Sequence, residues 1–190
     1  IQADMPTKPL PPLHPATRKP MTAEDLSEIF SKECAKQELD CEHAWIDIPE
    51  EVLEMYKYYR STPLVRAYAL EKALDTPAHI YFKNESVNPL GSHKVNSTIP
   101  QCYYCKKEGV TNVTTETGAG QWGAALSYAA KVYGLEAAVY QVKISMQQKP
   151  YRSLIMKTFG AMVEGSPSMS TRAGKDIVTR DPTHPGSLGT

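Results

Sequence analysis

Residues 111–124 read TNVTTETGAGQWGA, which is a β-rich run, then a glycine-rich loop, then the start of a helical pattern. A strand that ends in such a loop and continues into a helix is typical of ligand-binding α/β domains. Outward from this stretch, β-rich runs alternate with helical patterns. The β-rich runs lie near 79–85, 111–116, 137–142 and 161–164, and the helical patterns lie near 94–107, 121–133, 149–159 and 171–180. This alternation predicts an α/β fold with an open parallel sheet in a three-layer arrangement.

The first 61 residues have a different pattern and are predicted to form an N-terminal arm and two helices. Residues 1–20 contain six prolines and almost no periodic apolar pattern, so an extended arm is expected. Thr22 is the expected N-cap of the first helix, which carries an apolar stripe as far as Phe30. The second helix is expected to begin after Pro49 and to end at Thr62, which precedes a proline.

The composition argues against several classes of function. Twenty-one basic and 21 acidic residues give a formal net charge of zero, so no overall field would attract nucleic acid or an anionic membrane. The longest apolar runs are far shorter than the ~20 residues of a membrane-spanning helix, and the N-terminus lacks a signal-sequence pattern. We therefore expect a cytoplasmic protein that binds small molecules and neither nucleic acid nor membrane.

The four cysteines are too few for a disulfide scaffold and predict reduced thiols. Cys102 and Cys105 form a C-x-x-C pair inside a helical pattern, whereas structural zinc sites usually combine two short ligand hooks at regular separation. Cys34, Cys41 and His43 could be further zinc ligands, but their spacing does not support such a site. We predict small buried thiols and no metal.

The glycine loop, taken alone, leaves two interpretations open. Gly118, Gly120 and Gly123 match G-x-G-x-x-G between a strand and a helix, which is the context of a dinucleotide-binding loop. That kind of site expects an acidic residue about 20 residues further on, where the sequence reads YQVK at 140–143. Lys143 could instead meet a 2′-phosphate. A tight turn without any ligand is an equal alternative.

Lys94 follows His93 at the expected first turn of a helix. A lone lysine is usually a solvated, charged side chain. Here the positive end of the helix and a neighbouring imidazole both disfavour the ammonium form, and a neutral amine is the form that attacks an aldehyde. Lys94 is therefore a candidate nucleophile.

Two motifs resemble the cofactor-lysine and carboxylate-loop motifs of the tryptophan synthase β chain family. They read GSHKVN at 91–96 and ETGAGQWG at 116–123, and their joint occurrence in this order is highly specific. Trp122, together with QQKPYR at 147–152 and HPGSLG at 184–189, resembles the second, stand-alone type of this β chain.

The resemblance covers residues 62–190 and implies the N-terminal α/β domain of a fold-type-II enzyme that uses pyridoxal 5′-phosphate (PLP). It also implies a mobile subdomain at about 111–190. The family's glycine-rich phosphate loop and its partner for the pyridine nitrogen belong to a C-terminal domain that is absent from these 190 residues. We therefore expect an N-terminal fragment that is inactive by itself. Pro100 lies where the family usually has a small residue and is expected to bend the helix that follows Lys94.

The resemblance implies a role for each matching residue. Lys94 would hold PLP as a Schiff base and later move the α-proton, with His93 beside the cofactor phosphate and Asn96 in the cofactor site. Glu116 would be the acid–base group that helps the serine hydroxyl leave, and Arg152 would take part in closing the mobile subdomain. The substrate carboxylate would bind to the loop formed by Thr117, Gly118, Ala119, Gly120, Gln121 and Trp122.

The implied reaction is the formation of L-tryptophan from L-serine and indole. The resemblance also implies a homodimer for the complete chain and leaves open a tryptophan synthase α subunit as partner. A serine or threonine deaminase of the same PLP class is the nearest alternative. A non-catalytic dinucleotide-binding module and a fragment that does not fold alone are two further alternatives.

Overall fold

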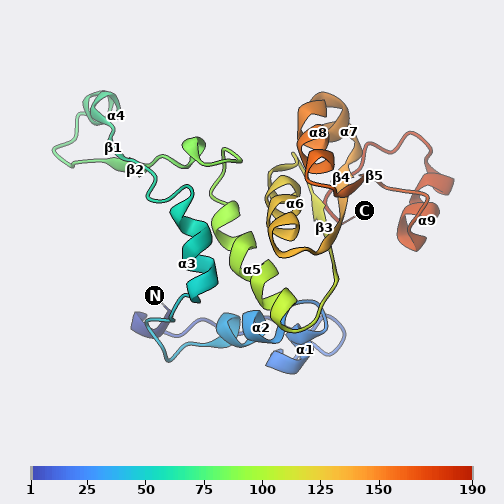
Figure 1. Cartoon of the computed structure of the whole chain (residues 1–190), viewed down its shortest axis with the longest axis horizontal. Helices are drawn as coiled ribbons and strands as arrows, with labels where there is room; N and C mark the ends of the chain where they lie inside the picture. The colour runs from blue at the N-terminus through green and yellow to red at the C-terminus, as the bar shows by residue number, and fades with distance from the viewer. Residues whose placement is uncertain (1, 190) are drawn as a thin grey trace.

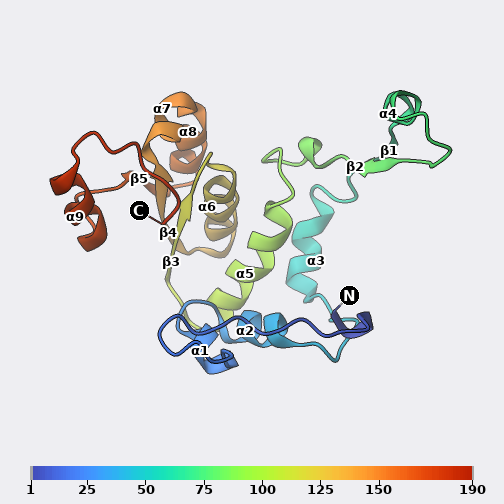
Figure 2. The same cartoon turned by 180° about the vertical axis from the view of Figure 1, so that it is seen from behind.

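The computed structural model describes residues 2–189 (Figure 1 and Figure 2). Before residue 60 it has one 3-10 turn and three short helices: η1 (Gln2–Asp4), α1 (Ala23–Ser27), α2 (Lys32–Leu39) and α3 (Glu50–Lys57). Thr22 caps α1 as predicted, because its hydroxyl accepts a hydrogen bond from the Asp25 amide and the Asp25 carboxylate accepts one from the Thr22 amide. The expectation of two helices is wrong, since Ser31 caps α2 as a separate helix.

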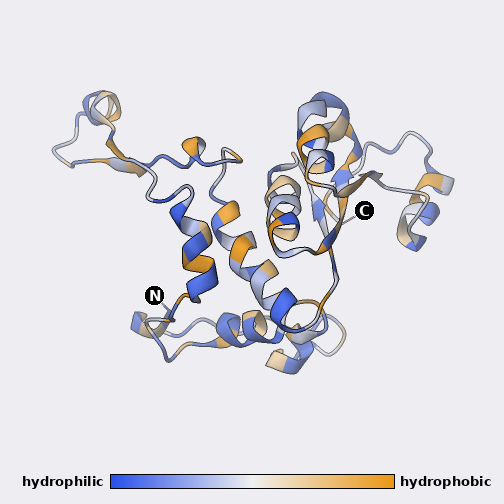
Figure 3. Ribbon diagram, in the orientation of Figure 1, coloured by the Kyte–Doolittle hydropathy of each residue, from blue (hydrophilic) through white to orange (hydrophobic). Residues whose placement is uncertain are grey.

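The strand expected near 79–85 does not belong to the parallel sheet. Instead β2 (Tyr81–Lys83) pairs antiparallel with β1 (Leu64–Arg66), and α4 (Tyr68–Ala73) lies in their connection. Periodicity predicts a strand but not its partner, and β1 is nearer along the chain than the other strands. Figure 1 shows this unit far from the parallel sheet, and Figure 3 shows apolar residues in its strands. None of the residues 64–83 is buried, so the unit has no core of its own.

The parallel sheet is confirmed, with three of the four expected strands. Its order is β3 (Asn112–Thr117), β4 (Glu136–Val142) and β5 (Met162–Ser166). The helices after residue 84 are η2 (Glu85–Val87), α5 (Val95–Lys107), α6 (Gln121–Tyr133), α7 (Lys143–Gln148), α8 (Pro150–Thr158) and α9 (Arg172–Arg180). All four helices predicted in this part are confirmed, whereas α7 was not predicted. Within the part of the chain that the structure describes, no helix is long and apolar enough to cross a lipid bilayer.

Both crossover helices pack on the same face of the parallel sheet. Because the strand order follows the chain order, right-handed connections place α6 and α8 on one face, where they contact each other. Val139 and Gln141 point to this face and are fully buried. Glu116 and Glu164 share a row on the opposite face, on either side of Tyr140. Residues 2–189 thus cover one face of the sheet with helices and do not form the expected three-layer arrangement.

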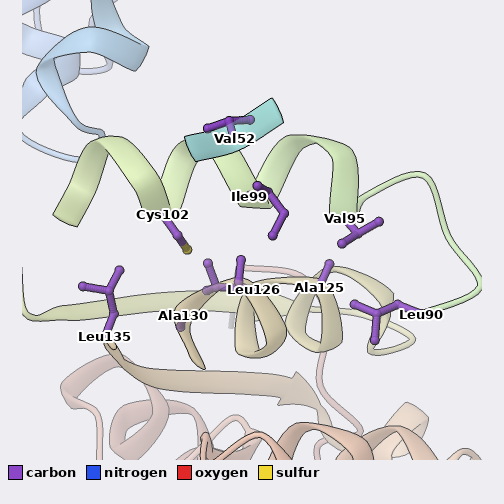
Figure 4. Packing of buried hydrophobic residues seen from close by; sticks show 10 residues of the cluster. Val52, Leu90, Val95, Ile99, Cys102, Ala125, Leu126, Ala130 and Leu135 are labelled. Atoms are coloured by element: carbon purple, nitrogen blue, oxygen red, sulfur yellow. The ribbon is translucent and has the colours of Figure 1, made fainter. Parts of the chain in front are cut away.

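Two apolar clusters hold α6 in place. The larger lies between α3, α5 and α6 (Figure 4) and consists of Val52, Leu90, Val95, Ile99, Cys102, Ala125, Leu126, Ala129, Ala130 and Leu135. The smaller lies between α6, α8 and the sheet and consists of Ala124, Val139, Met156 and Ala161. A Cβ atom at Gly123 would lie 2.7 Å from both Val139 Cγ1 and Met156 Sδ, so the glycine lets α6 approach the sheet closely. The larger cluster therefore packs α6 against α5, and the smaller one packs α6 against the sheet and α8.

The α5 helix continues through Pro100 to Lys107. A proline inside a helix has no amide hydrogen, so the carbonyl four residues earlier, on Asn96, loses its usual partner. The Tyr56 hydroxyl of α3 donates a hydrogen bond to that carbonyl at 2.6 Å. Burial raises the pKa of the Tyr56 phenol and keeps it a donor. A side chain from the neighbouring helix thus replaces the backbone hydrogen bond that Pro100 removes.

We predict that Tyr56→Phe lowers the free energy of unfolding by about 1–3 kcal/mol, because it leaves the Asn96 carbonyl without a partner. The same change in a Pro100→Ala background should cost much less, since the backbone amide of the new alanine can bond to the Asn96 carbonyl. Urea denaturation of the four proteins in this double-mutant cycle measures the difference. An equal loss of unfolding free energy in both backgrounds would contradict the conclusion that Tyr56 replaces the backbone hydrogen bond that Pro100 removes.

Candidate active site

The candidate site lies where α5 and α6 begin, at the carboxyl edge of the parallel sheet. Lys94 immediately precedes α5, and its Nζ atom lies 3.5 Å from Oε1 of Gln121, the first residue of α6. The close packing of α5 on α6 brings these two residues together from distant positions in the chain. The half-buried Lys94 thus lies beside the glycine loop at 116–123, which the sequence predicted as a ligand site.

The loop before Lys94 is held by the buried side chain of Asn88. Its Oδ1 atom accepts hydrogen bonds from the Leu90 amide at 3.0 Å and from the Ser92 amide at 3.2 Å. Its Nδ2 atom donates to the Ser92 carbonyl at 2.8 Å, while Gly91 turns the chain with φ +60°. These bonds fix the direction in which the chain enters α5 and therefore the position of Lys94.

Glu85 connects this loop to Asn96. Its Oε2 atom accepts from Asn88 Nδ2 at 3.2 Å and from Asn96 Nδ2 at 3.3 Å, while Oε1 accepts from the Thr62 hydroxyl at 2.7 Å. The hydrogen bond from Thr62, followed by those from Asn88 and Asn96, lowers the pKa of Glu85, so the carboxylate stays ionised. Neither of the two motifs, at 91–96 and 116–123, includes Glu85 or Asn88.

The glycine loop turns at Gly120, whose φ of +94° is in the left-handed region. A Cβ atom there would lie 2.8 Å from Arg152 Cβ and 3.1 Å from Gln141 Nε2, so a larger residue does not fit. The Thr117 hydroxyl accepts a hydrogen bond from the Gly123 amide at 3.2 Å. Gly120 itself offers no capping side chain, so among the described residues the amides of Gln121 and Trp122 at the start of α6 have no side-chain partner and are available to an anion.

Arg152 of α8 contacts both loops of the site. Its Nη1 atom lies 3.5 Å from the Leu90 carbonyl, and the first carbons of its side chain pack against Gly120. The arginine therefore links the mobile subdomain expected at 111–190 to the loop before Lys94.

Glu116 lies on the opposite face of the sheet from α6 and is exposed. Its Oε2 atom accepts a hydrogen bond from the Gly189 amide at 2.5 Å. Pro185 of the same C-terminal segment accepts from the Ile144 amide at 2.9 Å, and Leu188 approaches Gly118. Residues 184–189 thus cover the carboxyl edge of the sheet, and Glu116 is bonded to them rather than to Lys94.

Other predicted site residues lie near the same edge without a described bond to Lys94. His93 is exposed beside Lys94, and Trp122 is half-buried in the first turn of α6. Gln141, at the position where a dinucleotide fold would need an acidic residue, is fully buried under α8. A ribose could not reach it there, which weighs against the dinucleotide interpretation.

The cysteines lie away from this site. Cys102 is in the core between α5 and α6, and its burial raises the pKa of the thiol to about 12, which favours the neutral form over the thiolate that metals bind. Cys34, Cys41 and Cys105 are half-buried and not in disulfides. Among residues 2–189, no group of three or more His, Cys, Asp or Glu side chains is arranged to hold a metal ion.

Comparison with known proteins shows similarity to enzymes that depend on pyridoxal phosphate. A family model described as "Pyridoxal-phosphate dependent enzyme" matches residues 55–183. The chain is 53% identical over 189 residues to tryptophan synthase beta chain 2 of Thermotoga maritima, which is 100% of this chain and 44% of that protein. It is 50% identical over 190 residues to tryptophan synthase beta chain of Thermococcus onnurineus, covering 43% of that protein. The chain thus spans less than half the length of these relatives.

The fold has a counterpart among solved structures. A crystal structure of a pyridoxal 5′-phosphate-dependent aspartate racemase superposes with a TM-score of 0.52. The match covers 71% of this chain and 44% of that chain, at 21% sequence identity. At this identity the likeness concerns the fold alone.

Proposed function

Because the chain belongs to the pyridoxal-phosphate-dependent enzyme family, we propose that it carries the lysine and the substrate loop of an enzyme that forms L-tryptophan from L-serine and indole. The observation that carries the proposal is the contact between Lys94 and Gln121, which joins the two motifs at the carboxyl edge of a parallel sheet. The tryptophan synthase β chains that resemble the chain over its whole length support the choice of substrates.

The residues around Lys94 fit PLP. A lysine amine can bond covalently to the aldehyde of PLP, and Lys94 is half-buried beside the loop that would receive the substrate. Among the described residues Asn96 Oδ1 is buried without a hydrogen-bond partner, so it can accept one from a bound group. His93 is exposed and can approach a phosphate. When bound, PLP supplies an electron sink that stabilises negative charge on the substrate α-carbon.

Different residues of the chain would then bind the substrate and transfer protons. The first amides of α6 and the loop from Thr117 to Trp122 bind the substrate carboxylate. The Lys94 amine removes and returns the proton on the substrate α-carbon, and the Glu116 carboxyl group donates a proton to the departing β-hydroxyl oxygen. Because Glu116 is bonded to the Gly189 amide, that bond must open for Glu116 to act.

The small cluster of Ala124, Val139, Met156 and Ala161 gives the sheet, α6 and α8 a core of their own, which supports the proposal that residues 111–190 include a subdomain. Closure would bring α8 and Arg152 toward the loop before Lys94. The homodimer, an α-subunit partner and a cytoplasmic location stay predictions.

The test is to purify the full-length protein with PLP and to assay it with L-serine in the presence and absence of indole. We expect an absorption band of bound PLP and tryptophan formation that depends on indole. Pyruvate released from serine at the same rate with and without indole would favour a deaminase. Failure to bind PLP, with binding of a dinucleotide instead, would favour the non-catalytic module.

A further inference from the structure

Gln141 is a polar residue in an apolar environment. It lies near the end of β4 on the face covered by α8, and none of its surface is exposed. Val139 on the same strand and Met156 of α8 are also fully buried. An apolar side chain of similar length would fill this space without bringing polar atoms into it, so packing alone does not explain a glutamine.

The two ends of the Gln141 amide have different surroundings. Its Oε1 atom accepts a hydrogen bond from the Ser153 hydroxyl of α8 at 2.9 Å. Among the described residues its Nε2 atom is buried without a partner. A Cβ atom at Gly120 would lie only 3.1 Å from Nε2, so this nitrogen lies against Gly120 of the glycine loop. Ser153 therefore orients an unused donor toward the loop.

An unpaired buried donor destabilises the state in which it has no partner, so its presence is accounted for if another state of the protein supplies one. The turn of the glycine loop at Gly120 lies against Gln141 and Arg152, so a backbone carbonyl of this loop can supply the acceptor if the loop shifts. A loop that closes on a substrate carboxylate shifts at this turn, and a carbonyl of the loop can then accept from Nε2. The hydrogen bond would be made only in the substrate-bound state.

We infer that Gln141 is a positioning residue for the substrate loop: its Nε2 atom holds the Gly118–Gly120 turn in the carboxylate-binding conformation, and Ser153 orients it. This inference rests on the proposed function, because it concerns the same loop and substrate. It links α8 to substrate binding through two buried side chains, neither of which touches the substrate.

Gln141→Met keeps the length of the side chain and removes both the donor and the unpaired polar atom. In the full-length enzyme we expect a thermal midpoint equal to or above that of the wild type. The KM for L-serine should rise about tenfold, the effect of one lost hydrogen bond in the bound state, while the KM for indole and the affinity for PLP change less than about twofold. Ser153→Ala, which leaves the donor but not its orientation, should change the serine KM in the same direction by less.

Hydrogen–deuterium exchange provides a readout that does not depend on catalysis. With saturating L-serine, the amides of the Thr117–Gly120 loop should exchange faster in Gln141→Met than in the wild type, and those of α5 should not change. A uniform loss of PLP, indole and serine binding, or a lower thermal midpoint, would show a structural role and overturn the inference. Unchanged serine KM and unchanged loop exchange would overturn it as well. If the wild type bound PLP but made no tryptophan, the proposed function would fail, while loop exchange with serine would still decide the role of Gln141.

Discussion

Lys94→Ala in the full-length protein is expected to reduce tryptophan formation by a factor on the order of 10³ or more and to remove the covalent attachment of PLP. The reason is local. Lys94 supplies the amine that faces the start of α6, with its Nζ atom 3.5 Å from Gln121. An alanine leaves no group at that point to bond to the cofactor or to move the proton on the substrate α-carbon.

Borohydride reduction of the wild type followed by peptide mapping identifies the lysine that holds PLP. We expect the label on Lys94 alone, and no label on this peptide in Lys94→Ala. Lys106→Ala is a matched control, because Lys106 is exposed near the other end of α5 and should leave activity and labelling unchanged. A label on any other lysine in the wild type would exclude the assignment.

The helices after residue 90 were predictable from sequence because their signals are local. Apolar residues at helical spacing and a glycine just past the end fix α6, whose last turn is closed by Gly134 with φ +67°. The partner of β2 was not predictable in the same way, because strand pairing depends on contacts between distant segments. The short helix α7 was missed because Lys143 follows β4 with no turn residue between them.

In the site, too, local sequence signals were predictable and contacts between distant segments were not. The position of the ETGAGQWG motif at the carboxyl edge of the sheet was predictable, because it follows the parallel strand β3. The GSHKVN motif follows no strand of that sheet, and the packing of α5 on α6 brings Lys94 to the same place. The bonds that orient these residues come from elsewhere: Glu85 reaches Asn96, and Ser153 reaches Gln141. A buried glutamine in a strand has no periodic signal that separates it from a surface residue. The supporting residues therefore needed the structure.

Glu116 is the predicted site residue whose position differs most from its proposed role. Its side chain points to the face of the sheet that carries no helix, and its carboxylate is bonded to the Gly189 amide. Residues 184–189 must therefore release Glu116 before it can donate a proton to a leaving group. Proton donation at this site therefore depends both on the Glu116 side chain and on the position of residues 184–189.

Glu116→Gln should retain PLP binding and lose tryptophan formation by about 10²–10⁴-fold, because an amide can accept the Gly189 hydrogen bond but cannot donate a proton as a carboxylic acid does. Glu164→Gln is the matched control: Glu164 lies in the same row of the same face, two strands away, and its Oε2 atom accepts from Ser170 at 2.6 Å. We expect near wild-type activity from the control.

Steady-state assays with L-serine and indole, together with the absorbance of bound PLP, measure both variants. Wild-type turnover in Glu116→Gln would show that the proton comes from another group. An equal loss in Glu164→Gln would assign the effect to the charge of this face rather than to proton transfer by Glu116.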